Sequence, residues 1–201
     1  IIDNKLNSKE HIQDKSKKAT TVLNMLKRNL YFAPKIVKEK AYISCVLPII
    51  EYGSTCWSPT SNKLQNSLEM VHHNAAKFVA NKYPKKGSYD EFSISKVLSD
   101  LKWKSIQERR NHARLIMAFK IIKGHIILEP EMLPMTDSKY PSRKCKGIKY
   151  PDTQLIEPYS RLDNTQTTFF YATPKLWNST VTEALAEAPS IDAFKNNLKK
   201  L

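Results

Sequence analysis

Apolar positions recur every three to four residues through most of the first 82 residues, which is the spacing of one face of an α-helix. Ser8 is a suitable N-cap for a helix from about Lys9 to Leu30. Its apolar stripe comprises Ile12, Ala19, Val22, Leu23, Leu26 and Leu30. Its polar stripe comprises Lys17, Thr21, Asn24 and Arg28. We expect this helix to pack inward with one face and to expose a basic face, which either meets phosphates or is simply solvated.

A second helix is predicted from Pro34 to about Tyr52, since proline suits the first turn of a helix. Apolar residues cover nearly the whole circumference between positions 36 and 50, so we expect this helix to form the buried centre of a bundle. Pro48 is expected to kink it or end it early, because proline lacks the N–H that a helix needs.

A third helix is predicted from Ser61 to about Lys82. Its apolar stripe comprises Leu64, Leu68, Val71, Ala75, Phe78 and Val79, and the side chains expected to face away are Glu69, His73 and Lys77. Pro84 and Gly87 then form the most favourable domain boundary in the chain. Three amphipathic helices with short connections favour a small helical bundle over residues 1–84.

Two further helices are predicted after this boundary. Residues 93–101 form a short one, and Ser105-Ile106-Gln107-Glu108 matches the capping box that starts a longer one, expected to end at Gly124. The longer helix is apolar on two sides, so we expect it to be sandwiched between layers. A third strip along it carries Arg109, His112, Lys120 and Lys123.

The helical period fails between residues 129 and 168, where five of the 11 prolines lie. We expect an extended, basic arm there. Apolar residues that could anchor the arm follow it, with a short helix near 173–178: Phe169, Phe170, Leu176 and Trp177. A terminal helix over 190–200 starts at Ser190, with Ile191, Phe194, Leu198 and Leu201 inward. The predicted fold is therefore mainly α: a bundle (1–84), then a C-terminal helical region (88–201) with an extended proline-rich segment.

The chain carries 33 basic and 19 acidic residues, a formal net charge of +14. The excess is concentrated in residues 1–50 and 101–150, which we interpret as two walls of one groove for a polyanion. No apolar stretch is long enough to span a membrane or to act as a signal peptide, so no membrane partner is expected. Three cysteines without a C-x-x-C spacing favour a reducing, intracellular compartment.

Residues that would carry catalysis are missing. His72, His73 and the cysteines lack zinc-ligand spacing, and there is no nucleophile elbow, phosphate-binding glycine loop or carboxylate cluster. Tyr89-Asp90-Glu91-Phe92 is interpreted as a solvated turn. Of the two adjacent histidines, one is expected to be packed and the other solvated. We therefore predict no metal site, no cofactor and no catalytic activity for this chain alone.

Six sequence segments, taken in order, carry a family resemblance. They include His11-Ile12 with Lys18-Ala19 and Leu26 to Leu30; Lys38, Ala41-Tyr42, Val46-Leu47-Pro48, Glu51 to Ser54, Trp57 and Pro59; Leu68-Glu69 with Ala75 to Val79; Leu101-Lys102-Trp103, Arg109-Arg110, Arg114-Leu115 and Phe119 to Ile121; Phe169-Phe170 with Trp177-Asn178; and Phe194-Lys195. Together they resemble the region that follows the palm domain in reverse transcriptases of non-LTR (LINE-type, jockey-like) retrotransposons.

The resemblance implies that the chain is the thumb and C-terminal portion of an RNA-directed DNA polymerase. Ile1-Ile2-Asp3 is similar to the last strand leading out of the palm, and the chain opens without Met, so we expect a piece of a longer protein. The catalytic aspartates and their Mg²⁺ would belong to the missing palm. Implied partners are the RNA and DNA of a template–primer duplex and the upstream palm, fingers and endonuclease domains, in the nucleus and cytoplasm.

A polymerase must hold every sequence alike, so its contacts are expected to go to backbone phosphates. The expected contact residues are Lys17, Lys18, Lys27, Arg28, Lys35 and Lys38 on one wall; Arg109, Arg110, Arg114, Lys120 and Lys123 on the other; and Arg143, Lys144 and Lys146 on the arm. Alternatively, some arginines between 109 and 114 pair with Glu51 or Glu69.

Three alternative functions remain open at this point. The first is a helical protein-interaction module, derived from a truncated or host-adopted retroelement copy. The second is an active enzyme, for example a complete small nuclease. The third is a role at a membrane surface, although no basic helix here has a Trp-rich apolar face.

Overall fold

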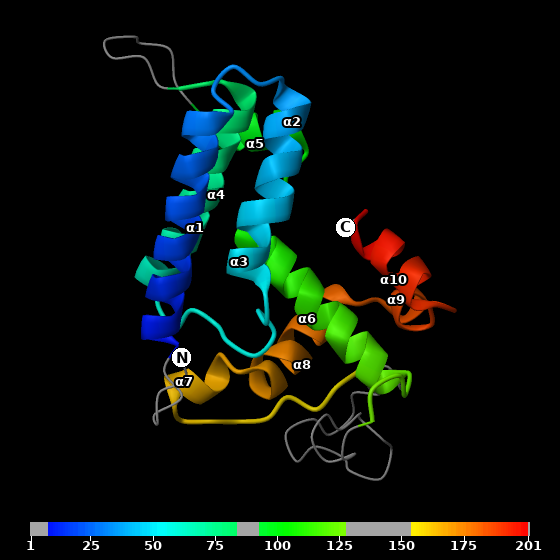
Figure 1. Cartoon of the computed structure of the whole chain (residues 1–201). Coiled ribbons are helices and arrows are strands. Elements are labelled where there is room, and N and C mark those ends of the chain that lie inside the picture. Colours follow the sequence, from blue (N-terminus) through cyan, green and yellow to red (C-terminus); the bar gives the residue numbers. More distant parts are fainter. Residues whose placement is uncertain (1–7, 84–92, 128–153, 201) are drawn as a thin grey trace. The chain divides into compact units, whose positions relative to one another are not determined.

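The computed structural model describes residues 8–83, 93–127 and 154–200, and the rest of the chain lies outside the description that follows (Figure 1). The described chain is mainly α-helical, as the sequence predicted. It divides into two compact units: unit 1 comprises Ile1–Ser54 and Ser58–Arg110, and unit 2 comprises Thr55–Trp57 and Asn111–Leu201.

The helices of unit 1 follow the predicted order. They are α1 (Lys9–Asn29), α2 (Lys35–Ala41), the π-helix η1 (Tyr42–Val46), α3 (Leu47–Glu51), α4 (Asn62–Ala80), α5 (Ile94–Leu101) and the first residues of α6 (Ile106–Ile122). Helices α1 and α4 lie side by side in the bundle (Figure 1).

The two long helices pack through the apolar stripes expected for them. In α1 the buried side chains are Ile12, Ala19, Leu23 and Leu26, and in α4 all six residues of the predicted stripe are buried. A polar contact supplements this packing, since the Ser16 hydroxyl of α1 donates to the carbonyl of Ser67 in α4 at 3.1 Å. The Ser61 side chain caps α4 by accepting from the Leu64 N–H at 3.4 Å.

The second predicted helix is not a buried centre, which corrects the expectation drawn from its composition. Its buried residues are Lys38, Tyr42, Val46, Leu47 and Ile50. Their spacing of three to four residues defines a single inward face, whereas Ile36, Val37 and Ile43 are exposed. Apolar residues around the whole circumference therefore do not guarantee burial where too few neighbouring elements cover the helix.

Pro48 does not end the helical path early. It lies in the first turn of α3, directly after the π turn of η1. Proline cannot donate to the carbonyl four residues earlier, and a widened turn accommodates that missing hydrogen bond while the helix continues. The path ends beyond Glu51, before Gly53, which has a positive φ of 64°.

A buried aromatic cluster connects three segments of unit 1. Tyr42 of η1 and His72 of α4 share a hydrogen bond of 2.7 Å between the phenol oxygen and Nδ1. The Trp103 ring stacks on both, with centroids 4.8 Å from Tyr42 and 5.2 Å from His72, and its Nε1 donates to Glu39 at 2.9 Å. His72 is thus the packed histidine of the pair, whereas His73 is half-buried.

Unit 1 continues past the domain boundary expected at residues 84–88, which themselves lie outside the described residues. Helix α5 packs on α4, and Glu69 of α4 accepts hydrogen bonds from the backbone N–H groups of Ile106 at 3.2 Å and Gln107 at 3.0 Å. These contacts bind the start of α6 to unit 1. Glu69 was expected to face away from the bundle. It instead supports the first turn of α6.

The amino terminus of α6 forms the predicted capping box. The Ser105 N–H donates to Glu108 Oε2 at 2.8 Å, and the Glu108 N–H donates to Ser105 Oγ at 3.2 Å. The helix ends before Gly124, whose φ of +74° is the left-handed conformation typical of a residue after a helix. Both ends of this helix thus agree with local sequence signals.

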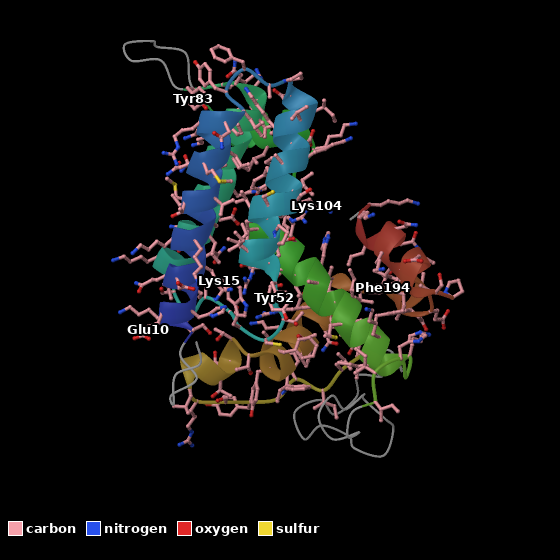
Figure 2. The ribbon with its side chains drawn as sticks, in the orientation of Figure 1. Glu10, Lys15, Tyr52, Tyr83, Lys104 and Phe194 are labelled. Carbon is pink, nitrogen blue, oxygen red and sulfur yellow. The ribbon has the colours of Figure 1, made fainter. Side chains whose placement is uncertain are left out.

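Unit 2 is built from the remainder of α6, α7 (Asp163–Gln166), α8 (Phe169–Thr180), α9 (Glu183–Ala186) and α10 (Ile191–Leu198). Three rings form the centre of its core: Phe194 stacks on Phe119 at 4.2 Å and on Trp177 at 5.9 Å between centroids. Figure 2 labels Phe194 on α10. Ser190 caps α10 as predicted, by accepting from the Ala193 N–H at 3.1 Å.

The extended arm predicted for residues 129–168 is described only from residue 154. Its last part contains the short helix α7, which the failing helical period did not indicate. Before α7, Asn178 of α8 holds the backbone of Leu155, because its side chain accepts from the Leu155 N–H at 3.0 Å and donates to the Leu155 carbonyl at 2.9 Å. The segment before α7 is therefore fixed on α8.

Candidate nucleic-acid interface

The outer face of α1 carries the polar stripe that the sequence predicted. Lys17, Thr21, Asn24 and Arg28 are all exposed. Lys17 and Arg28 form no ion pair with any described residue. Their positions, eleven residues apart, place them about 16 Å apart along the helix axis. Figure 2 shows Glu10 and Lys15 on other parts of the same helix, projecting to different sides.

The carboxylates of unit 1 are mostly engaged in holding the fold together. Glu51 pairs with Arg109, Glu69 and Glu108 support the start of α6, and Glu39 accepts from Trp103. Two more form surface ion pairs: Asp14 with Lys18 at 3.1 Å and Asp100 with Lys82 at 2.7 Å. Those carboxylates are consequently engaged elsewhere, and none of them forms an ion pair with Lys17 or Arg28.

An exposed aromatic pair lies in the turn between α1 and α2. The Phe32 side chain is 96% exposed, and its ring meets that of Tyr31 edge to face at 4.9 Å between centroids. Burial and then the proximity of Tyr31 raise the pKa of Tyr83, which lies at the same end of the bundle (Figure 2). We call Tyr31, Phe32 and Tyr83 the aromatic tip. Arg28 and Lys35 flank it in sequence, and both are exposed.

Aromatic rings that are exposed beside cations are typical of surfaces on which nucleic-acid bases stack. The aromatic tip cannot be predicted from cations and apolar stripes taken separately, since it combines exposed rings with neighbouring cations. The signal was present as Tyr31-Phe32 directly between the basic residues 27–28 and Lys35.

Several residues expected to contact phosphates have other surroundings. Lys38 is buried with its Nζ 5.0 Å from the centre of the Phe78 ring, a cation–π contact within the bundle. Lys18 is paired with Asp14. Lys27 is half-buried, and burial followed by the charge of Lys77 lowers its pKa. Lys38 is therefore corrected from a free phosphate contact to a residue of the bundle interior, whereas Lys18 and Lys27 stay predictions.

The three arginines of α6 are not a free basic wall. Arg109 donates to both oxygens of Glu51, which is the alternative that the sequence left open, and its hydrogen bonding to Glu51 raises the pKa of Arg109. Arg110 is buried and donates to the Ser54 carbonyl at 3.4 Å. Arg114 is buried in unit 2 and donates to the Thr167 carbonyl at 3.0 Å.

The other expected contacts stay predictions. Lys120 lies on the unit 2 part of α6, and Lys123 follows the end of this helix, exposed with its Nζ 5.6 Å from the centre of the Phe119 ring. Arg143, Lys144 and Lys146 lie outside the described residues. In unit 1, the expected contact residues that are exposed and form no ion pair among the described residues are thus Lys17 and Arg28 of α1 and Lys35 at the start of α2.

Among the described residues, no group of three or more histidine, cysteine, aspartate or glutamate side chains is placed to hold a metal ion. None of the helices in the described ranges has both the length and the apolar character that crossing a bilayer requires.

Comparison with known proteins gave no relative from which an activity could be transferred. No model of a protein family, no curated protein and no solved structure matches the chain.

Proposed function

We propose that unit 1 binds double-stranded nucleic acid through backbone phosphates, as part of a non-catalytic C-terminal portion of a retrotransposon reverse transcriptase that holds its template–primer duplex. The observation that carries this proposal is the outer face of α1, where Lys17 and Arg28 are exposed without an ion pair among the described residues. The family resemblance of the sequence supports the choice of a template–primer duplex as the ligand.

Physical chemistry favours a phosphate ligand on this face. A cation that a carboxylate already neutralises gains little from a phosphate, whereas a solvated lysine or arginine releases condensed counterions when it binds one. The exposed amide of Asn24 lies between the two cations and suits phosphate oxygens, whereas the Thr21 hydroxyl already donates to the Lys17 carbonyl at 3.1 Å. These contacts read no base edges, so binding is expected to be independent of sequence.

Charge reversal tests this proposal. In the double variant Lys17→Glu with Arg28→Glu, we expect affinity for an RNA–DNA hybrid to fall at least tenfold. We expect the slope of log K against log salt to decrease by about two, because two phosphate contacts are lost. Fluorescence anisotropy over a series of salt concentrations measures both quantities.

The matched control reverses one arginine and one lysine that are exposed in unit 2, Arg161→Glu with Lys200→Glu, and changes the net charge by the same amount. This control separates the α1 face from a general effect of charge. Equal losses in the two variants, or no loss in the α1 variant, would remove the α1 face from the proposal.

One observation favours the alternative of a protein-interaction module. Ile36 and Ile43 are 57% and 47% exposed, and they lie seven residues apart on one side of the α2–η1 path, with Val37 adjacent. Under the nucleic-acid proposal, Ile36→Ser with Ile43→Ser, which adds no charge, leaves hybrid binding unchanged. Loss of hybrid binding in that variant, with the α1 variant unaffected, would move the nucleic-acid contact from α1 to this face.

A further inference from the structure

Unit 2 contains a pocket of about 560 Å³ that the sequence analysis did not anticipate. Residues of α6, α8 and the segment fixed by Asn178 line it, and those with polar or aromatic side chains include Arg114, Glu157, Tyr159, Tyr171 and Lys175. Its volume lies within the range of pockets that bind small organic ligands.

Arg114 is the unusual member of this lining. Its side chain is only 6% exposed, yet its one hydrogen bond among the described residues runs from Nη2 to the Thr167 carbonyl. Its Nε is buried without an acceptor in the described part of the chain. Burial lowers its pKa, and no carboxylate in the described part of the chain offsets that effect.

A buried guanidinium normally has a carboxylate partner, because removing a charge from water without compensation is costly. Arg109, five residues earlier on the same helix, has such a partner in Glu51. Glu157 also lines the pocket, but it accepts from the Asn178 amide at 3.1 Å and forms no ion pair with Arg114. The charge of Arg114 is thus uncompensated within the described chain and adjoins an open pocket.

We propose that this pocket binds a nucleotide, with Arg114 and Lys175 holding its phosphate group and the rings of Tyr159 and Tyr171 contacting its base. Arginine donates to phosphate in a bidentate geometry, and a phosphate monoester carries about −1.5 to −2 charge at neutral pH. Two cations against the single carboxylate of Glu157 suit such an anion. Aromatic faces supply the stacking that bases favour.

This inference goes beyond the proposed function, since it concerns unit 2 and a single nucleotide rather than the backbone of a duplex. The same chemistry could come from a free mononucleotide or from the phosphorylated end of a strand. Adenosine 5′-monophosphate is the probe for the first source, and an RNA oligonucleotide with or without a 5′-phosphate is the probe for the second.

Isothermal titration of the full chain tests the site. We expect saturable binding of adenosine 5′-monophosphate, with adenosine and inorganic phosphate each at least tenfold weaker. Arg114→Met should weaken nucleotide binding at least tenfold, because it removes the buried cation and keeps much of the side-chain volume. The matched control is Arg161→Met, which removes an exposed arginine outside the pocket lining and should change the affinity less than twofold.

Two further measurements keep the result interpretable. Lys175 is exposed, so Lys175→Met tests the phosphate contact without disturbing the core, and it should weaken binding about threefold or more. The variant Lys17→Glu with Arg28→Glu should bind the mononucleotide normally, so failure of the α1 interface and failure of this pocket are distinguishable. In that same variant, a higher affinity for the RNA oligonucleotide with a 5′-phosphate than for the one without it identifies a strand end as the ligand.

Three results would overturn the pocket proposal. They are the absence of saturable binding of adenosine 5′-monophosphate to the wild-type chain, equal affinity for adenosine and its monophosphate, and unchanged nucleotide binding in both Arg114→Met and Lys175→Met.

Discussion

Three arginines within six residues of α6 have three different surroundings. Arg109 is paired with Glu51, Arg110 donates to the Ser54 carbonyl, and Arg114 is buried beside a pocket. The sequence predicted all three as phosphate contacts and left pairing with Glu51 or Glu69 open. Which one pairs could not be predicted, because the partners lie more than fifty residues away in sequence and only the tertiary fold brings them together.

The buried histidine gives unit 1 a defined pH dependence. Burial lowers the pKa of His72 to about 4, so the folded state keeps it neutral while the unfolded state takes up a proton near pH 6.5. The unfolded state therefore binds more protons between these values, and stability is lost as the pH falls from 6.5 towards 4. The loss from this residue is on the order of 3 kcal/mol.

The variant His72→Gln should remove most of that dependence. Urea unfolding at pH 7 and pH 4.5 measures this dependence. The matched control is His73→Gln, since His73 is half-buried and the charge of Glu69 opposes the lowering of its pKa by burial. If His72→Gln retains the full wild-type difference between the two pH values, the assignment to His72 is wrong.

The aromatic tip makes a separate prediction for single residues. We expect Phe32→Ala to weaken binding of single-stranded RNA by about 1–2 kcal/mol, because one stacking ring is lost. The salt slope should stay unchanged, since no cation is removed. Anisotropy titration compares it with Tyr52→Ala, which removes an exposed ring at another end of the bundle (Figure 2). An equal effect of both variants would count against a stacking role for the tip.

At the scale of elements, local signals predicted where helices begin and end. The capping box at Ser105–Glu108, the cap at Ser61 and the left-handed Gly124 all depend on residues within one turn of the helix end. The burial of α2 and η1 could not be read in the same way, because it depends on which elements cover them. Glu69 illustrates the same limit, since it supports a helix that begins 37 residues later.

Glu69 is therefore expected to matter more than an ordinary surface carboxylate. We expect Glu69→Ala to lower the free energy of unfolding by about 1–2 kcal/mol, because two N–H groups at the start of α6 lose their acceptor. Urea denaturation measures the change. Glu10→Ala, an exposed carboxylate in the first turn of α1, is the control and should cost much less. Equal costs would mean that Glu69 does not cap α6.

At the scale of the whole molecule, the net charge of +14 predicts a polyanionic partner but does not indicate which surface would bind it. The sequence identified the α1 stripe because a helical face follows from periodicity alone. It did not identify the aromatic tip or the pocket of unit 2, since both depend on side chains from separate elements. Lys38 was predicted to contact phosphate, because nothing in the neighbouring sequence indicates that a lysine will be buried against an aromatic ring.

The central claim is that the outer face of α1 contacts nucleic-acid phosphates. The most direct test is NMR titration of the full chain with a short RNA–DNA hybrid, with chemical-shift changes mapped on the backbone and on lysine and arginine side chains. We predict that the largest changes in unit 1 lie at Lys17, Arg28 and residues 31–35. Changes centred instead on Ile36, Val37 and Ile43, with the α1 face unaffected, would contradict the claim.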